Sequence, residues 1–295
     1  MNVTEAIAEY ITDSATKGNA PLTLTYYEKS LGRFANFAGD VEVTSISLSL
    51  CKKYYFYLTD SGLASGSVQT YIRGFRAFLH WLYENEYIDS NICNKFKLPK
   101  AYQKQPNILT DSEIEKLYAS FDSDFYGLRN RSMCFLMLDS GLRLGEVLTL
   151  EKALLHLDEG YCIVNGKCQK QRIVPLSRVS VFLLRSYIKA IPASCSGSPL
   201  VFNSIDGTPL SRNAVTDMFR RHKARCGISR LHPHLLRHTF ATKYLENGGN
   251  IYALQSILGH TTLEMVKRYL HLSQNRVCTD FNKYSPMGNL TGIAG

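Results

Sequence analysis

The chain has 295 residues, of which 45% are hydrophobic and 20% charged, with a formal net charge of +9. This is the composition of a globular protein with room for two domains, and its basic balance favours a polyanionic partner. No apolar run reaches the length of a membrane span, and the first residues lack the features of a secretion signal. We therefore predict a cytoplasmic location and no membrane partner.

The basic excess is unevenly distributed. Residues 1–100 hold ten Lys and Arg and ten Asp and Glu, so they are neutral overall. Residues 101–295 hold 24 and 15, so all nine excess charges lie in this second part. A uniformly basic protein would not divide in this way. The eight cysteines are scattered without a CxxC pair or other ligand spacing, so we predict no metal site and no cofactor.

The first hundred residues have the pattern of a helical domain. Helices are predicted from about residue 22 to 38, over 47–60, and over roughly 67–84 with caps offered by Ser65 to Ser67. The third helix has the clearest apolar stripe, at helical spacing, which must face a core. The members of this stripe are Val68, Tyr71, Ile72, Phe75, Phe78, Leu79 and Leu82.

The opposite face of this third helix is polar. It carries Gln69, Arg73, Arg76 and His80, also at helical spacing. For a lone helix a solvated polar face would be the favoured explanation. These side chains are, however, the kind that reach base edges and phosphates in a major groove, so we predict that they contact DNA.

The segment 99–106 breaks the helical pattern. It has two prolines, few apolar groups and several cations, which is typical of an interdomain linker. We predict a DNA-binding domain over residues 1–98, a linker over 99–107 and a second domain over 108–295.

The second domain begins with a helix start, where Thr110 or Asp111 is the cap and Glu113 lies in the first turn. An apolar helix follows within 130–150, broken at Ser140 and Gly141, with a further helical turn through residue 146.

Two short strands are predicted next, over 161–165 and 172–176, joined across Asn165-Gly166-Lys167 as a hairpin. From residue 177 the pattern is helical again, with a strongly basic helix at roughly 211–226. We predict that Arg212 and Arg220 on this helix contact DNA.

The most informative residues lie in the last third of the chain. His234 and Arg237 stand in Pro233-His234-Leu235-Leu236-Arg237-His238, followed by His260 in Leu258-Gly259-His260 and by Tyr269 in Arg268-Tyr269-Leu270-His271, while Arg143 lies far upstream. Metal-free phosphodiester transfer needs fixed cations for the non-bridging oxygens, and arginine donates two parallel bonds to a phosphate. A tyrosine can attack the phosphorus and keep it covalently, which conserves the bond energy without ATP.

Each residue also has a plainer interpretation. Tyr269 is one of 18 tyrosines, a single histidine such as His234 or His260 is more often structural, and Arg143 could cap a helix. The combined order and spacing make those separate explanations poor, because five coincidences would be needed.

With these residues in view, the chain resembles a tyrosine recombinase of the phage integrase and Xer type over nearly its whole length. The segment Ser140-Gly141-Leu142-Arg143-Leu144-Gly145-Glu146 is similar to the first-arginine motif of that family. Asn165-Gly166-Lys167 with Gln171-Arg172-Ile173-Val174-Pro175-Leu176 resembles its lysine hairpin, and His234-Leu235-Leu236-Arg237-His238 resembles its HxxR box. These motifs are specific as a set and weak singly.

The resemblance implies a role for each matching residue. Arg143, Arg237 and His260 would bind the scissile phosphate of DNA, and Tyr269 would be the nucleophile. Lys167 would be the general acid, assisted by His234. The resemblance also implies that Glu146 is the acidic residue that orients its neighbours. Lys170 lies on the same hairpin and is an alternative to Lys167 as the acid; we prefer Lys167, directly after the glycine, and predict that Lys170 and Arg172 contact DNA.

The same resemblance implies the fold and the assembly. The fold class would be mainly α with a small antiparallel β-sheet in the catalytic domain, and a SAM-like core-binding domain would complete a two-domain C-shaped clamp around double-stranded DNA. The tail after Tyr269, with Val277, Phe281 and Tyr284 at helical spacing, would pack on a neighbouring protomer of a homo-tetramer, or fold back on its own domain. About twenty residues before the first predicted helix leave no room for an arm-binding domain, which favours simple core sites with inverted repeats.

Two other functions remain open at this point. One is a DNA-binding regulator that kept the fold without catalysis, and the other is relaxation of DNA as by a type IB topoisomerase. A mobile-element integrase is slightly preferred to a resolvase or a chromosome dimer-resolution enzyme.

Overall fold

The computed structural model describes residues 1–97, 107–166, 171–195 and 197–259, together with 262 and 266. The chain divides into two compact units, which we call unit 1 (Met1–Lys104) and unit 2 (Gln105–Gly295). No helix in the described ranges is long and apolar enough to span a bilayer.

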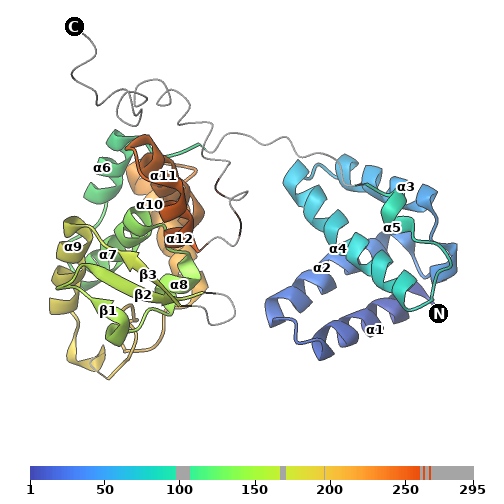
Figure 1. Cartoon of the computed structure of the whole chain (residues 1–295), viewed down its shortest axis with the longest axis horizontal. Helices are drawn as coiled ribbons and strands as arrows, with labels where there is room; N and C mark the ends of the chain where they lie inside the picture. Colours follow the sequence, from blue (N-terminus) through green and yellow to red (C-terminus); the bar gives the residue numbers. More distant parts are fainter. Residues whose placement is uncertain (98–106, 167–170, 196, 260–261, 263–265, 267–295) are drawn as a thin grey trace, which may run out of the picture. The chain divides into compact units, whose positions relative to one another are not determined.

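Unit 1 is helical. Helix α4 lies at its centre and contacts each of the other four helices (Figure 1). Large aromatic side chains fill the space between them, with Phe34 and Phe75 at a centroid separation of 4.2 Å and Tyr10 and Trp81 at 5.5 Å. The helices are α1 (Val3–Thr16), α2 (Pro21–Ala38), α3 (Leu48–Asp60), α4 (Ser65–Glu84) and α5 (Ile92–Lys95), with a 3-10 turn η1 (Val43–Ser45).

Two expectations for unit 1 were wrong. Helix α1 precedes the predicted first helix, begins with a reciprocal capping box between Asn2 and Glu5, and is held to α4 by the Trp81 indole, which donates to Asp13 at 2.8 Å. Ser65 does not cap α4 but is its first helical residue, and the cap position is Ala64, which offers no side-chain oxygen.

Unit 2 combines helices with one small sheet (Figure 1). Helix α7 contacts both α9 and α11, and α12 contacts strand β3. The elements are α6 (Asp111–Ala119), α7 (Phe125–Ser140), α8 (Leu144–Leu148), η2 (Lys152–Leu154), β1 (Leu155–His156), β2 (Tyr161–Asn165), β3 (Gln171–Pro175), α9 (Arg178–Lys189), η4 (Ala193–Cys195), α10 (Arg212–Cys226), α11 (Pro233–Glu246) and α12 (Ile251–Leu258).

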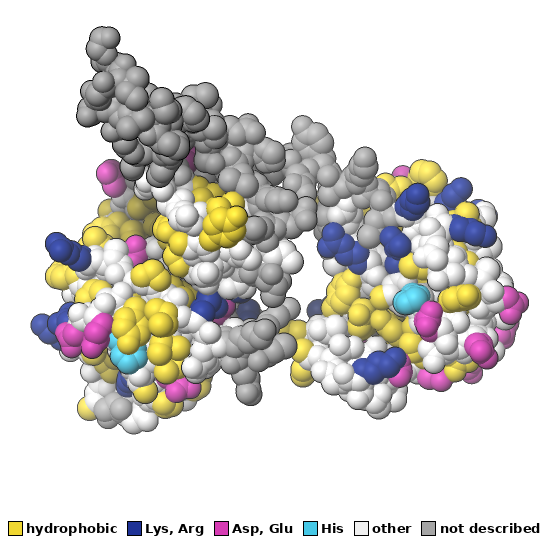
Figure 2. Space-filling model, viewed as in Figure 1, with side chains coloured by type: hydrophobic (Ala, Val, Ile, Leu, Met, Phe, Trp, Pro, Cys, Tyr) yellow, Lys and Arg dark blue, Asp and Glu magenta, His cyan; other side chains and the backbone are white. Residues whose placement is uncertain are grey.

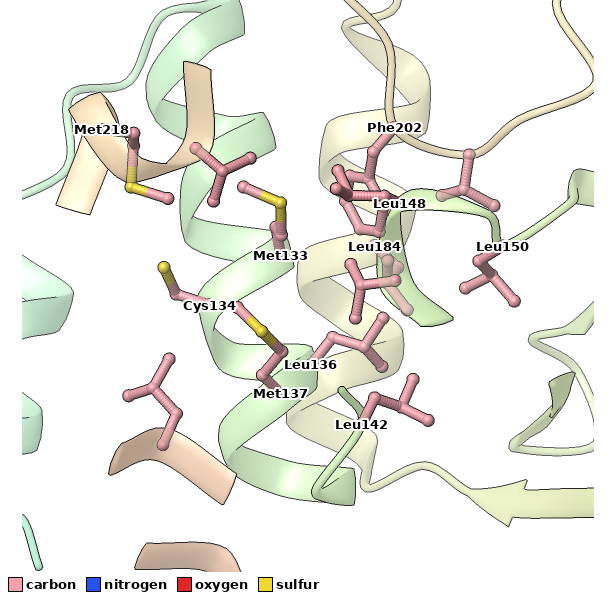
Figure 3. Packing of buried hydrophobic residues seen from close by; sticks show 14 of the residues in the cluster. Met133, Cys134, Leu136, Met137, Leu142, Leu148, Leu150, Leu184, Phe202 and Met218 are labelled. Carbon is pink, nitrogen blue, oxygen red and sulfur yellow. The ribbon is translucent and has the colours of Figure 1, made fainter. Parts of the chain in front are cut away.

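The core of unit 2 surrounds α7. Its residues Met133, Leu136 and Met137 are buried, and side chains from α8, α9 and α10 pack around the same helix (Figure 3). The helix ends at Gly141, whose φ of +64° is a left-handed conformation that glycine adopts without strain. A Cβ there would lie 2.5 Å from Phe240, so the turn also lets α11 approach closely.

The sheet confirms the predicted hairpin and adds one strand. Its order is β1-β2-β3, antiparallel throughout, with Cys162 opposite Val174 in the β2–β3 pair. The predicted basic helix is also confirmed, as α10 with Ser211 as its cap, and Thr110 caps α6 in a box with Glu113. The predicted fold class, mainly α with a small antiparallel sheet, is therefore confirmed.

Candidate active site

Five of the predicted site residues in unit 2 come together in the structure. Arg143 is the cap residue of α8, Glu146 lies in α8, Arg172 in β3, and His234 and Arg237 in α11. Four more predicted residues lie outside the described residues. They are Lys167, Lys170, His260 and Tyr269.

Two arginines from distant parts of the sequence meet at the C-terminal end of α12. Arg143 Nη1 donates to the carbonyl oxygen of Leu258 at 3.3 Å, and Arg237 Nη2 donates to the same oxygen at 2.9 Å. Arg237 also donates to the carbonyl oxygen of Gly141. The Arg143 side chain is 38% exposed, whereas Arg237 is only 5% exposed. Both guanidiniums are thus fixed by backbone groups, and one of them remains accessible to a ligand.

Glu146 is the acidic partner of this group. Its Oε1 accepts from Arg143 Nη1 at 3.0 Å, and its Oε2 accepts from the Arg143 backbone N–H at 2.8 Å. Arg172 binds both oxygens of the same carboxylate, at 2.9 Å each. Burial would raise the pKa of Glu146, but hydrogen bonds from Arg172 and the Arg143 backbone, with both positive charges, hold its pKa below the ordinary value. Two guanidiniums share this one carboxylate, and Arg237 binds the same backbone oxygen as Arg143, so the group as a whole has a positive excess suited to a phosphate.

His234 lies in the first turn of α11 and remains open to solvent. Partial removal of its ring from water, followed by the charges of His232, Arg237 and Arg143, lowers its pKa below the ordinary value. The ring is therefore mainly neutral near pH 7, a state in which it can accept a proton. Among the described residues, no three His, Cys, Asp or Glu side chains gather where a metal ion could bind.

Comparison with known proteins identifies the family. The phage integrase family pattern matches residues 107–276, and the phage integrase SAM-like domain pattern matches residues 2–98. The chain belongs to the phage integrase family. It is a tyrosine recombinase, and site-specific recombination is its function.

Individual relatives agree with this assignment. Tyrosine recombinase XerD of Staphylococcus aureus is 29% identical over 278 residues, covering 92% of this chain and 94% of the relative. The Tn1549 transposon integrase in complex with transposon right end DNA has a TM-score of 0.78 at 19% identity, covering 95% of this chain and 99% of that one. The lambda integrase dimer bound to a COC′ core site has a TM-score of 0.75 at 19% identity, covering 91% and 95%. The two structural likenesses concern the fold.

Arg172 was predicted from the sequence to contact DNA, and the structure places most of its side chain inside the protein. Its side chain is 13% exposed, and its Nε donates to the carbonyl oxygen of Ile257 at 2.7 Å while the two Nη atoms bind Glu146. The sequence contains a sign of this placement. Side chains alternate between the two faces of a strand, and Arg172 stands two residues before Val174, which is buried, so both point to the inner face.

The remaining DNA-contact predictions for the recombinase stay predictions, but their side chains differ in availability. On α4, Arg73 and His80 are exposed and Gln69 is half-buried. Arg76 is half-buried and donates to the Sγ of Cys93 at 3.4 Å and to its carbonyl oxygen at 3.2 Å, which ties α4 to α5.

The two candidate arginines of α10 are both exposed. Arg220 pairs with Asp217 on the same helix at 2.9 Å. Arg212 lies beside α8, because its Nη2 is 2.9 Å from the position that a Cβ on Gly145 would take. Arg212 is therefore adjacent to the turn that carries Arg143 and Glu146.

Proposed function

We propose that the recombinase cleaves and rejoins duplex DNA through a covalent bond between Tyr269 and a DNA 3′ phosphate. The observation that carries the proposal is the convergence of Arg143 and Arg237 on one backbone oxygen, beside the buried carboxylate of Glu146. Preorganised cations of this kind stabilise the charge that develops on the non-bridging oxygens during phosphoryl transfer.

The proposed reaction has one transfer step in each direction. The Tyr269 oxygen attacks the phosphorus and passes its proton to a base, for which the neutral ring of His234 is the candidate, while the bond from phosphorus to the 5′ oxygen breaks. Lys167 gives a proton to the leaving 5′ oxygen, and His234, neutral near pH 7, assists proton movement. Arg143, Arg237 and His260 hold the phosphate. Attack by a 5′ hydroxyl reverses the step, so the cycle uses neither ATP nor a metal ion.

The proposed substrate is duplex DNA with inverted-repeat core sites, bound by both domains in a C-shaped clamp and by four protomers in a synapse. The DNA complexes of Tn1549 transposon integrase and lambda integrase support a DNA partner for this fold. The charge on unit 1 supports it as well. On the face shown in Figure 2, Lys and Arg lie mostly on the upper half of that unit, and Asp and Glu mostly along its lower and right-hand edges.

We propose, finally, that the enzyme acts in the cytoplasm, where its DNA partner lies, and that it serves a mobile element. The likeness to a transposon integrase supports the second point, and inverted repeats in the DNA that flanks the gene would test it.

The test of the chemistry is covalent trapping. The substrate is a duplex that carries the recombination site and a nick close to the cleavage point. After attack, the short fragment that bears the new 5′ hydroxyl diffuses away, so the enzyme cannot reseal the strand. The unaltered chain should form a covalent protein–DNA adduct on this substrate, and Tyr269→Phe should form none. Tyr252→Phe is the matched control, because Tyr252 is an exposed tyrosine of the same unit, and it should still form the adduct. An adduct from Tyr269→Phe at the normal yield overturns the proposal.

A further inference from the structure

Arg172 uses each of its three nitrogen atoms inside the protein. Nε donates to the carbonyl oxygen of Ile257, Nη1 to Glu146 Oε1 and Nη2 to Glu146 Oε2, with separations between 2.7 and 2.9 Å. A bidentate pair of this kind fixes the relative orientation of both groups, which a lysine ammonium cannot do. Arg172 therefore fastens strand β3 to α8 and to the last turn of α12.

Arg172 binds Glu146 and the last turn of α12, and these same two groups bind the proposed phosphate-binding residues Arg143 and Arg237. The Glu146 carboxylate accepts hydrogen bonds from the guanidinium and from the backbone N–H of Arg143. Ile257 is followed by Leu258, whose carbonyl oxygen accepts from Arg143 and Arg237. A shift of the Arg172 guanidinium would thus be passed to both arginines through Glu146 and the end of α12.

The end of α12 is shaped around this guanidinium. Gly259 has a φ of +62°, and a Cβ on it would lie 3.0 Å from Arg172 Nη1 and 3.1 Å from Nε. That separation is tighter than ordinary van der Waals contact, so a side chain at residue 259 would press on the guanidinium.

We propose that Arg172 is a positioning residue that sets Glu146, Arg143 and the end of α12 in the geometry for cleavage, in place of the DNA contact predicted from the sequence. The inference rests on the proposed cleavage chemistry. It makes a distinct prediction about pH, because Glu146 is buried and Arg172 supplies the strongest of the interactions that keep it ionised.

In the part of the chain that the structure describes, three charged or titratable side chains face Glu146. They are Arg143 on its own helix, Arg172 on β3 and the Cys162 thiol on β2, whose pKa is raised to about 12 by burial, so that it is neutral near pH 7. The last turn of α12 contributes backbone carbonyl oxygens. Without Arg172, burial dominates and raises the pKa of Glu146, so the carboxyl takes up a proton as pH falls and releases Arg143.

The experiment compares Arg172→Lys with Arg230→Lys in the full chain. Arg230 is a matched control, because it also binds both oxygens of a carboxylate, Glu113, and one backbone oxygen, that of Ile108. Binding to the site and single-turnover adduct formation at saturating DNA are measured from about pH 6 to about pH 9. Thermal melting shows that each variant is folded.

For Arg172→Lys we expect binding with an unchanged salt dependence, and an adduct rate about 100-fold lower near pH 7 that recovers as pH rises. Arg230→Lys should melt at a lower temperature and cleave at the normal rate. In a Glu146→Gln background, Arg172→Lys should show no recovery with pH, since no carboxyl remains to ionise. If Arg172→Lys fails to fold, Gly259→Ala applies the same test with Arg172 present, and its rate should also recover as pH rises.

Two results would overturn the inference. One is a normal cleavage rate for Arg172→Lys at saturating DNA. The other is weaker binding with a reduced salt slope and no change in the pH profile, which is the behaviour of a phosphate contact. Failure of the unaltered chain to form any adduct would instead count against the proposed function, so the two failures are distinguishable.

Discussion

Arg143 and Arg237 donate to the same carbonyl oxygen, yet they stand in different surroundings. Arg143 is partly open to solvent and pairs with Glu146, whereas Arg237 is buried and binds the backbone at both Gly141 and Leu258. Removing a buried donor leaves its acceptors unsatisfied, at a cost of about 1–3 kcal/mol. Arg237 thus supports the fold as well as the proposed site, and Arg143 mainly the site.

We predict that Arg143→Ala and Arg237→Ala will both bind the recombination site while cleavage falls roughly a hundred- to a thousandfold. Only Arg237→Ala should also lose unfolding free energy, by about 1–3 kcal/mol. Band-shift titration, the trapping assay and urea unfolding measure the three quantities. A loss of binding as large as the loss of cleavage would argue that these arginines position the DNA instead.

Among the elements, α1 shows that a signal in the sequence can be overlooked. Val3, Ala6, Ile7 and Tyr10 are buried and stand at i, i+3, i+4 and i+7, and the Asn2–Glu5 capping box precedes them. Strand β1 carries no such signal, since its two residues are too few to show an alternating pattern. The hairpin and the basic helix were predictable because each has a clear period and a cap or turn.

At the candidate site, the sequence pattern predicted a set of residues, of which the structure brings five together, but it did not predict all of their contacts. Arg143, Glu146 and Arg237 stand in recognisable motifs. The inward position of Arg172 depends on where α12 packs against β3, and the convergence on Leu258 depends on its backbone oxygen, which no residue pattern reveals. Tertiary packing of this kind lies beyond local periodicity.

The contact between α6 and α10 provides a prediction about pH. His222 of α10 is buried, its Nδ1 lies 2.9 Å from the Ser120 hydroxyl, and its ring packs on Phe121 at a centroid distance of 4.1 Å. Burial, followed by the charges of Arg225 and Arg221, lowers the pKa of His222 from 6.5 to about 4. The unfolded chain therefore takes up this proton more readily than the folded one.

We predict that this histidine stabilises the fold fully above about pH 6.5, and that its contribution declines as pH falls toward 4, by roughly 3 kcal/mol in total. Urea unfolding of the unaltered chain and of His222→Gln, each from about pH 7 to about pH 4.5, measures it. The variant cannot titrate at this position, so the stability difference between the two proteins should change with pH. A constant difference across that range would contradict the assignment.

At the scale of the whole molecule, charge separates the two parts of the chain. Residues 1–100 are neutral, and the whole excess of +9 lies beyond them. Unit 1 still carries exposed cations on α4, where Arg73 is open to solvent while Arg76 is occupied with Cys93. The net charge of unit 1 therefore does not describe how its exposed positive charge is placed.

We predict that the logarithm of the binding constant falls linearly and steeply with the logarithm of salt concentration, since each neutralised phosphate adds about 0.9 to the slope. Arg73→Gln should reduce the slope by about one, and Arg76→Gln, its neighbour on α4, should leave the slope unchanged and lower the melting temperature. Titrations at several salt concentrations test this. An affinity indifferent to ionic strength would rule out a backbone-tracking interface.

The aromatic core of unit 1 has a practical consequence for watching this enzyme. Trp81, buried beside Phe78 and hydrogen-bonded to Asp13, is the single tryptophan of the sequence. Indole fluorescence consequently reports on the first unit alone, and the rearrangements of the other half are silent to it. The melting of unit 1 can therefore be followed by its own fluorescence, while circular dichroism follows the helices of both units together.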